Sequence, residues 1–319
     1  MTQDKKAYIE FCQSEQNIPL FMKSDWLDAV CTEGVDWDVV LSKNKGGDIV
    51  CILVFLIKKK WGLTFLTEPP LSPYCGIWFR DTKGQTSHEQ YHFIKSHISS
   101  LIHQLPRFHF AHFRFSTLLT DWQPFYWAGF KQTTAYTYRL DLTQTRPLFS
   151  QFNQNTQRNI AKAKKHYVVN TEGSFKHFLT INRLVFERQS KQYPIAGSVW
   201  QQVEALLSRH NQRRILFAQN TEGVIDAAVY IVYDGQTAYY LAGGSTDKGR
   251  QLGAMHLLLS EAIDEAQRLG CTVFDFEGSM LKGVESFFRG FNGVLTPYFK
   301  VWKYRNAVFE WLDGVRKVF

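Results

Sequence analysis

Residues 239–256 read YYLAGGSTDKGRQLGAMH, a glycine-rich segment between an apolar strand and an amphipathic helix. Glycines allow main-chain N–H groups to approach an anion, and the start of a helix adds positive potential. We therefore expect Gly243, Gly244, Ser245 and Arg250 to bind a phosphate-bearing substrate. The spacing matches neither GxGxxG nor GxxxxGK[S/T], so a dinucleotide site or P-loop is not indicated. An ordinary glycine-rich turn is the alternative.

Strands and helices are predicted on both sides of this segment. Runs rich in apolar residues predict strands at 214–219, 224–233, 237–241 and 271–276. Apolar residues at helical spacing predict helices at 154–166, 175–191, 199–210 and 252–269, the last followed by Gly270 as a C-cap. Such a mixture is typical of an α/β (α+β) domain with a mixed sheet.

The first half of the chain mixes the same kinds of element. Strands are predicted at 37–42, 48–59, 61–66 and 108–115, and helices from Ser24 and at 88–104. We expect a first domain at 1–140, a second domain with the active groove at 141–305, and a terminal helix at 306–319. The 319 residues are enough for two such domains.

Composition and charge restrict the classes of function. The formal net charge of +8 favours acidic partners such as phosphates, nucleic acid or an anionic membrane surface. The longest apolar run, 49–57, is far shorter than the roughly 20 residues of a membrane span, and the N-terminal residues are polar. The five cysteines are scattered without a CxxC pair, so we expect no disulfide framework and no metal site. The expected location is the cytoplasm.

A basic stripe is predicted on the helix at 154–166. Arg158, Lys162 and Lys165 are spaced i, i+4 and i+7, and residues 142–171 contain no acidic residue. A stripe of this kind suits a diphosphate or an RNA backbone. A solvated lysine face is the alternative.

Two carboxylates follow in the segment 273–278, VFDFEG. Asp275 and Glu277 are two residues apart, so on a strand they would share one face at its C-terminal end. There they could orient an amine or accept a proton. Capping of the next turn and pairing with an arginine are equally good interpretations.

The segment 284–293, VESFFRGFNG, places a cation between aromatic residues beside two glycines. As a turn in a pocket wall, it would let Arg289 stabilise an oxyanion or a leaving hydroxyl. Phe288 and Phe291 would then hold an acyl or amino-acid side chain.

Together these four segments resemble the Fem family of nonribosomal peptidyl transferases, a branch of the tandem acetyltransferase-fold (GNAT) proteins. The family has a basic helix with an Arg-Asn pair, like residues 157–163 here, and then a Gly/Ser segment leading into a long helix, like 243–271. A Tyr-Asp-Phe-x-Gly strand is matched by 274–278, and a Phe-Lys-x-Gly-Phe-Gly phrase by 287–293. Order and spacing agree over the second half, whereas the first domain matches only in element order.

The resemblance implies two tandem GNAT-like domains with mixed central sheets, and a terminal helix that packs back on the first. It implies transfer of an aminoacyl group from aminoacyl-tRNA to an amine of a peptidoglycan precursor, with no tightly bound cofactor. Arg158, beside Lys162, would bind the precursor's diphosphate. Tyr240 and Asp275 would position the nucleophile, and Arg289 would neutralise charge that develops on the donor.

The chain departs from the family pattern in several places. Arg289 stands where the family has lysine, Asn292 interrupts the last phrase, and residues 167–200 lack the heptads of a coiled-coil arm that tRNA-binding members often carry. Acyl-CoA-dependent relatives have the motif Arg/Gln-x-x-Gly-x-Gly/Ala, which residues 250–255 follow except at Met255. An acyl-CoA donor with a small amine acceptor is therefore an alternative. A non-catalytic protein that binds RNA or another anion is a second one.

Overall fold

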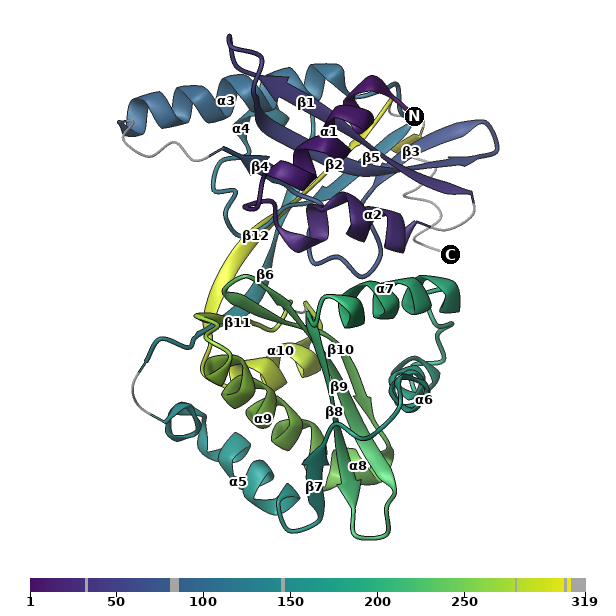
Figure 1. Cartoon of the computed structure of the whole chain (residues 1–319), viewed down its shortest axis with the longest axis vertical. Helices are drawn as coiled ribbons and strands as arrows, with labels where there is room; N and C mark the ends of the chain where they lie inside the picture. The colour runs from purple at the N-terminus through teal and green to yellow at the C-terminus, as the bar shows by residue number, and fades with distance from the viewer. Residues whose placement is uncertain (32–33, 81–85, 145–146, 279, 307–308, 311–319) are drawn as a thin grey trace. The chain divides into compact units, whose positions relative to one another are not determined.

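The computed structural model describes residues 1–31, 34–80, 86–144, 147–278, 280–306 and 309–310 (Figure 1). They form two compact units, one of Met1–Ala135 with the residues from Pro297 onward and one of Tyr136–Thr296. The boundaries fall inside two strands, β6 (Lys131–Asp141) and β12 (Val294–Tyr304). From the sequence, the boundary between the two domains was expected near residue 140, with β12 in the second domain. Most of β12 belongs with the first unit because it pairs with β5, a long-range contact that no local pattern encodes.

The first unit contains a mixed sheet in the order β1-β2-β3-β5-β12, with β4 paired to β2. Its other strands are β1 (Val35–Lys43), β2 (Ile49–Lys60), β3 (Leu63–Thr67), β4 (Ile77–Phe79) and β5 (Phe110–Arg114). Its helices are α1 (Gln3–Ser14), η1 (Leu20–Met22), α2 (Ser24–Val30), α3 (Ser87–Gln104) and α4 (Gln123–Trp127). β3 and β5 run parallel, whereas the other pairs are antiparallel. The apolar run of the sequence lies in β2, where it is buried on both faces of the sheet.

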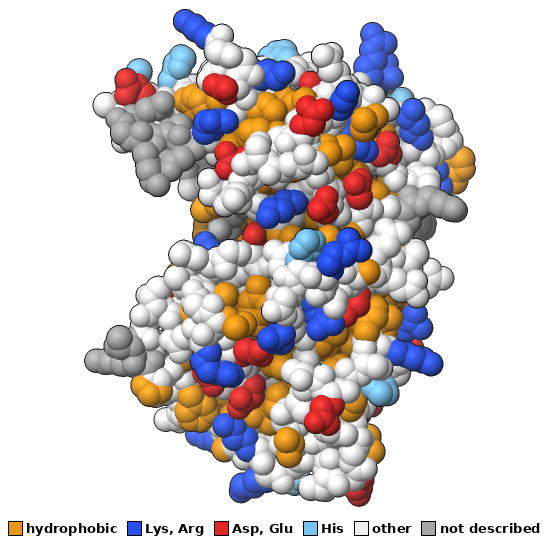
Figure 2. Space-filling model, in the orientation of Figure 1, with side chains coloured by type: hydrophobic (Ala, Val, Ile, Leu, Met, Phe, Trp, Pro, Cys, Tyr) orange, Lys and Arg blue, Asp and Glu red, His pale blue; other side chains and the backbone are white. Residues whose placement is uncertain are grey.

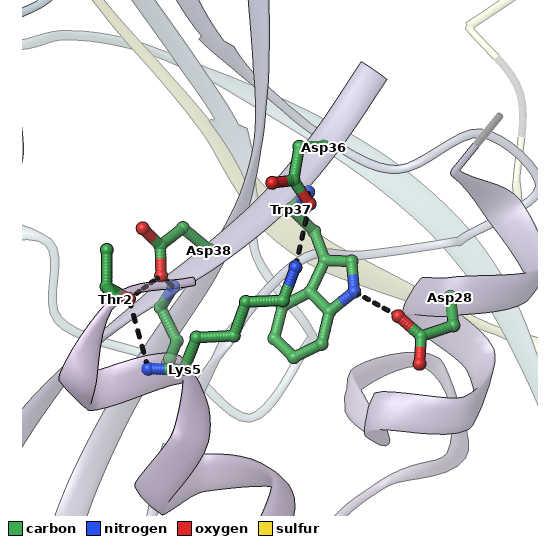
Figure 3. A network of polar contacts seen from close by, with 7 residues as sticks. Thr2, Lys5, Asp28, Asp36, Trp37 and Asp38 are labelled. Atoms are coloured by element: carbon green, nitrogen blue, oxygen red, sulfur yellow. Dashed lines mark hydrogen bonds and ion pairs between the residues drawn. The ribbon is translucent and has the colours of Figure 1, made fainter. Parts of the chain in front are cut away.

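A polar network fixes α1 and α2 to β1 (Figure 3). The ammonium of Lys5 lies 4.2 Å from the centre of the Trp37 ring and 2.7 Å from the Asp36 carboxylate. The indole N–H of Trp37 donates to Asp28 on α2 at 2.6 Å. The Lys5 side chain is only 12% exposed, so the cation–π contact lies in a partly desolvated setting, where it is stronger than on an open surface. The Asp36 side chain is 74% exposed, so its ion pair with Lys5 adds little.

The second unit contains the sheet order β6-β11-β10-β9-β8-β7. Its strands are β7 (Tyr167–Asn170), β8 (Arg213–Asn220), β9 (Ile225–Asp234), β10 (Thr237–Ser245) and β11 (Val273–Asp275). Its helices are η2 (Leu148–Gln151), α5 (Gln154–Ala163), α6 (Phe175–Glu187), α7 (Gly197–Arg209), α8 (Asp247–Gln251), α9 (Ala254–Arg268) and α10 (Lys282–Arg289). β10 and β11 pair in parallel, whereas β6–β11, β10–β9, β9–β8 and β8–β7 pair antiparallel.

Helices cover both faces of this second sheet. Val229 and Ile231 on β9 belong to the core that includes the apolar face of α9. Tyr230 points the other way and packs on Phe178 of α6 and Trp200 of α7, at centroid distances of 5.2 and 5.6 Å. A strand buried on both faces is apolar throughout, which explains the continuous run at 227–232.

The α/β prediction with mixed sheets is confirmed, and so is the helix expected at 252–269, which is α9. This helix begins after Gly253, whose φ of +79° separates α8 from α9. One local prediction needs correction. The turn expected at 284–293 begins as helix α10. The terminal helix expected at 306–319 lies outside the described residues, apart from 306, 309 and 310.

The described ranges contain no helix that is both long and apolar enough to cross a bilayer. Within the same ranges, no group of three or more His, Cys, Asp or Glu side chains could hold a metal ion. The cysteines are free thiols.

Candidate functional site

The parallel strands β10 and β11 separate part-way along β10. They pair from Thr237 opposite Val273 to Tyr239 opposite Asp275, where β11 ends. β10 continues to Ser245 and stays paired with β9 on its other side. A β-bulge follows Tyr240, at the point where the two strands separate. From this point β10 has an edge that β11 does not cover.

The glycines of the opening motif lie in β10 and not in a loop, which corrects the prediction for Gly243, Gly244 and Ser245. A Cβ on Gly243 would lie 2.6 Å from the hydroxyl of Tyr240, and one on Gly244 would lie 2.6 Å from the carbonyl oxygen of Ile181 on α6. The glycines therefore allow α6 and the Tyr240 ring to approach the strand closely. Main-chain binding of an anion does not explain them.

An anion site is instead favoured at the start of α9, beside α5. No side chain caps the first turn of α9, so its N-terminal N–H groups can receive an acceptor. A Cβ on Gly253 would lie 2.7 Å from the carbonyl oxygen of Asn159, so α5 packs directly on this turn. The ammonium of Lys162 donates to the carbonyl oxygen of Gln251 at 2.8 Å. This contact brings the basic stripe of α5 next to the helix start.

The charges around this turn are mostly positive. Arg158, Lys162, Lys248 and Arg250 are all exposed. Arg250 pairs with Asp247 at 3.1 Å, whereas Arg158 bonds only the neutral side-chain amide of Gln154. On the face shown in Figure 2, lysines and arginines alternate with acidic residues and do not form one large patch. The positive charge is therefore local, and Arg158, Lys162 and Arg250 lie on the two helices, α5 and α8, that meet at this turn.

Tyr240 lies at the other end of the uncovered edge of β10. Its ring meets Phe288 of α10 edge-on, with centroids 5.7 Å apart. Burial raises the pKa of the Tyr240 hydroxyl, and the nearby Glu277 carboxylate raises it further. The hydroxyl therefore stays protonated at neutral pH and is suited to donate a hydrogen bond.

Asp275 makes the contacts of the structural alternative, capping of the next turn and pairing with an arginine. Its carboxylate accepts the hydroxyl of Thr137 at 2.6 Å and the N–H of Glu277 at 2.9 Å, and lies 3.4 Å from Arg139. Burial raises the pKa of this carboxyl, and these three partners oppose the change. Asp275 and Glu277 do not share a strand face, because β11 ends at Asp275 and Glu277 has a φ of +56°. Asp275 is thus a positioning residue that holds the turn after β11.

Helix α10 separates the residues predicted at 284–293. Arg289 is exposed and lies 3.0 Å from Glu285, which accepts the hydroxyl of Tyr138 at 2.6 Å. Phe288 and Phe291 are 4% and 0% exposed and belong to the core, so they do not line an open pocket as predicted. The helical period explains the difference, since it turns the Phe288 ring inward and leaves its neighbour Arg289 outside.

His256, in the first turn of α9, contacts the rings of Phe287 and Phe291 at centroid distances of 4.8 and 6.3 Å. Burial lowers the pKa of its imidazole to about 4. The unfolded chain binds this proton near pH 6.5, so the folded state loses stability as pH falls from about 6.5 to about 4. We expect a loss of roughly 2–3 kcal/mol over that window.

The matched variant for this prediction is His256→Phe, which keeps a ring among Phe287 and Phe291 but cannot take up a proton. We expect its stability to fall less than that of the wild type when urea unfolding is measured between pH 7 and 4.5. His112 and Arg114 lower the pKa of Glu68 to about 2, so the contribution of this carboxylate to folding stability is lost mainly below the pH range of the experiment. Parallel curves for the two proteins would contradict the burial of a neutral imidazole.

Two candidate functional residues, Asn182 and Arg188, were not identified from the sequence. Asn182 donates its side-chain amide to the carbonyl oxygen of Gly243 at 2.9 Å, and Arg188 donates to that of Ser245 at 2.6 Å. Thr246 bonds Asp226 of β9 through its N–H, so the alternation of an antiparallel ladder turns the Gly243 and Ser245 carbonyls away from β9. Side chains from α6 and the residue after it therefore cap the uncovered edge of β10.

A weak signal for one of them was present in the sequence. Asn182 lies next to Ile181 on the buried face of α6, and it is itself only 5% exposed. A buried amide needs hydrogen-bond partners. Nothing in the sequence indicated that its partner would be Gly243.

Residues 150–289 match the family model described as acetyltransferase (GNAT) domain. This match identifies residues 150–289 as a GNAT-type acyltransferase domain. The matched region contains the uncovered edge of β10, the start of α9, the basic stripe of α5 and α10. No curated protein sequence matches this chain.

Solved structures show that the tandem GNAT fold extends over most of the chain. FemX aligns with a TM-score of 0.63 at 12% identity, over 94% of this chain and 96% of its own. L-PGS from Bacillus licheniformis aligns with a TM-score of 0.55 at 11% identity, over 100% and 98%. A tandem GNAT protein from the clavulanic acid biosynthesis pathway aligns with a TM-score of 0.51 at 11% identity, over 91% and 98%. At these identities the likeness concerns the fold.

Proposed function

We propose that this acyltransferase moves an aminoacyl group from aminoacyl-tRNA to an amine of a peptidoglycan precursor. The proposed location is the cytoplasm, with peripheral contact to an anionic membrane through the basic surface. The fold likeness to FemX and the motifs of the second half support this choice of reaction.

The capped edge of β10 is the observation that favours the tRNA donor over acyl-CoA. The extended arm of CoA carries two amides, and an extended ligand with amides pairs well with a free strand edge. Here the carbonyl oxygens of Gly243 and Ser245 already accept hydrogen bonds from Asn182 and Arg188. An acyl-CoA would have to displace both side chains, whereas the ribose ester at the end of a tRNA does not need this edge.

The site residues receive roles in this proposal. Arg158, Lys162 and Arg250 bind phosphates of the substrates at the start of α9. The acceptor nitrogen attacks the ester carbonyl, a C–N bond forms, and the C–O bond to the ribose breaks. The proton lost by nitrogen passes to the ribose oxygen. The Tyr240 hydroxyl orients the reacting groups, and Arg289 stabilises the negative oxygen of the tetrahedral intermediate.

A transfer assay tests the choice of donor. The purified full chain is incubated with a cell-wall precursor and either radiolabelled aminoacyl-tRNAs or radiolabelled acetyl-CoA. We expect label on the precursor from aminoacyl-tRNA only. Transfer from acetyl-CoA alone would overturn the proposed donor, and binding of tRNA without any transfer would favour a non-catalytic anion-binding protein.

A variant of the cap tests the structural argument separately. Arg188→Ala removes the donor to Ser245, so we expect CoA to stabilise this variant and not the wild type in thermal unfolding. A ligand at about 100 times its Kd adds about 2.7 kcal/mol of stability. Arg183→Ala, an exposed change on the same helix, is the control and should behave like the wild type. Equal stabilisation of the wild type and both variants by CoA would contradict the proposal that the capped edge of β10 keeps CoA out.

A further inference from the structure

The first unit contains a parallel strand pair that corresponds to β10 and β11. β3 and β5 pair in parallel through Phe65 opposite Phe110 and Leu66 opposite Ala111, and β12 pairs antiparallel to β5. β3 ends at Thr67, and Glu68 follows directly. The side chain directly after this strand end is therefore charged.

Glu68 binds two side chains from β5. One carboxylate oxygen lies 2.7 Å from Nδ1 of His112, and the other lies 2.8 Å from a guanidinium nitrogen of Arg114. The three side chains are 21% to 27% exposed, so the cluster is half-buried and still reaches solvent. Each oxygen of Glu68 therefore lies beside one of these two side chains.

Lys300 adds a further cation beside this cluster. The register of β12 places it directly opposite Arg114 on β5. Like charges in directly opposed positions destabilise a strand pair. Among the described residues the Lys300 ammonium makes no hydrogen bond or ion pair, and its nearest recorded contact is the Tyr298 ring at 6.0 Å. Burial and the Arg114 charge lower the pKa of this ammonium, and Glu68 only partly opposes them.

We infer that Lys300, Arg114 and His112 form a binding site for a small oxyanion, a phosphate or a carboxylate, in the first unit. The two permanent cations exceed the one carboxylate of Glu68, so a bound oxyanion would neutralise the excess positive charge. It would give the Lys300 ammonium the acceptor that it lacks. Glu68 acts as the positioning residue, since it holds His112 and Arg114 on the same side of the sheet.

A purely structural role fits the cluster less well. Glu68, His112 and Arg114 pair with one another without Lys300. An apolar side chain at position 300 would remove a half-buried charge that faces another cation. In the absence of ligand, we therefore expect Lys300→Met to melt at the same temperature as the protein that keeps Lys300, or at a higher one.

The test measures binding and does not depend on the proposed transfer reaction. Inorganic phosphate and acetate are titrated separately into the full chain at constant ionic strength, by calorimetry and thermal unfolding. The background is Arg158→Ala/Lys162→Ala, which removes the other proposed anion site. Three versions are compared in it: Lys300→Met, Lys300→Arg, and Lys59→Met as an exposed control on β2.

We expect at least one of the two oxyanions to bind the background protein and its Lys59→Met version equally. Lys300→Met should weaken that binding at least tenfold, whereas Lys300→Arg should retain most of it. If phosphate binds, the ligand chemistry is a phosphate, and if acetate binds, it is a carboxylate. Unchanged affinity in Lys300→Met, or no binding of either probe to the background protein, would overturn the inference. If Lys300→Met fails to fold, loss of binding in a folded Lys300→Gln version is the decisive result.

Discussion

Gly278→Ala is expected to prevent stable folding of the second unit. A Cβ at this position would lie 2.0 Å from the carbonyl oxygen of Tyr136 and 2.5 Å from the Cα of Thr137, both main-chain atoms of β6. Gly278 also has a φ of +62°, where a side chain adds about 1–2 kcal/mol of strain.

The surrounding contacts leave no room for relaxation. β6 pairs with β11, and the N–H of Phe276 donates to the carbonyl oxygen of Tyr138 at 3.0 Å. The Asp275 carboxylate ties the same turn to Thr137. We therefore expect Gly278→Ala to cost more than about 4 kcal/mol, the range reached when packed main chain is displaced.

The matched control is Gly283→Ala on α10. No atom lies within 4 Å of a Cβ at that position, and alanine favours a helix by about 0.5–1 kcal/mol. Yield, circular dichroism and urea unfolding are measured for both variants beside the wild type. Equal stability of the two variants would contradict the close packing of the turn on β6.

Arg158→Ala/Lys162→Ala is expected to lower kcat/KM for transfer by a factor on the order of 10²–10⁴. Each charge-assisted hydrogen bond to a phosphate contributes about 1.5–3 kcal/mol, and both side chains are exposed beside the uncapped start of α9. Because the phosphates do not react, most of the effect should appear in KM. The measurement is steady-state transfer from aminoacyl-tRNA at fixed ionic strength.

Lys176→Ala, an exposed change on α6, is the control for general loss of charge and should keep the wild-type rate. Urea unfolding checks that the double variant remains folded. An unchanged KM in the double variant would show that the phosphates bind elsewhere. A protein that only binds RNA would instead lose affinity, with a shallower dependence on salt.

Local sequence patterns were enough to predict the α/β class, most of the elements and one part of the site. The basic stripe of α5 was visible because residues four apart lie on one face of a helix, whatever the rest of the fold does. β9, β10 and most of α9 followed from apolar periodicity in the same way. Arg158 and Lys162 were therefore placed on one face of α5 before any contact between α5 and the start of α9 was known, and phosphate binding by them and by Arg250 stays a prediction.

The remaining features depend on contacts between residues far apart in the chain, which local periodicity does not contain. Thr137 meets Asp275 across 138 positions, and this contact makes Asp275 a positioning residue. The approach of α6 explains Gly244 as a packing position, and Asn182 reaches Gly243 across 61 positions. β12 leaves the second unit to pair with β5, which brings Lys300 opposite Arg114. In each case the partner is set by three-dimensional packing, so the sequence showed the residue type and the fold determined its role.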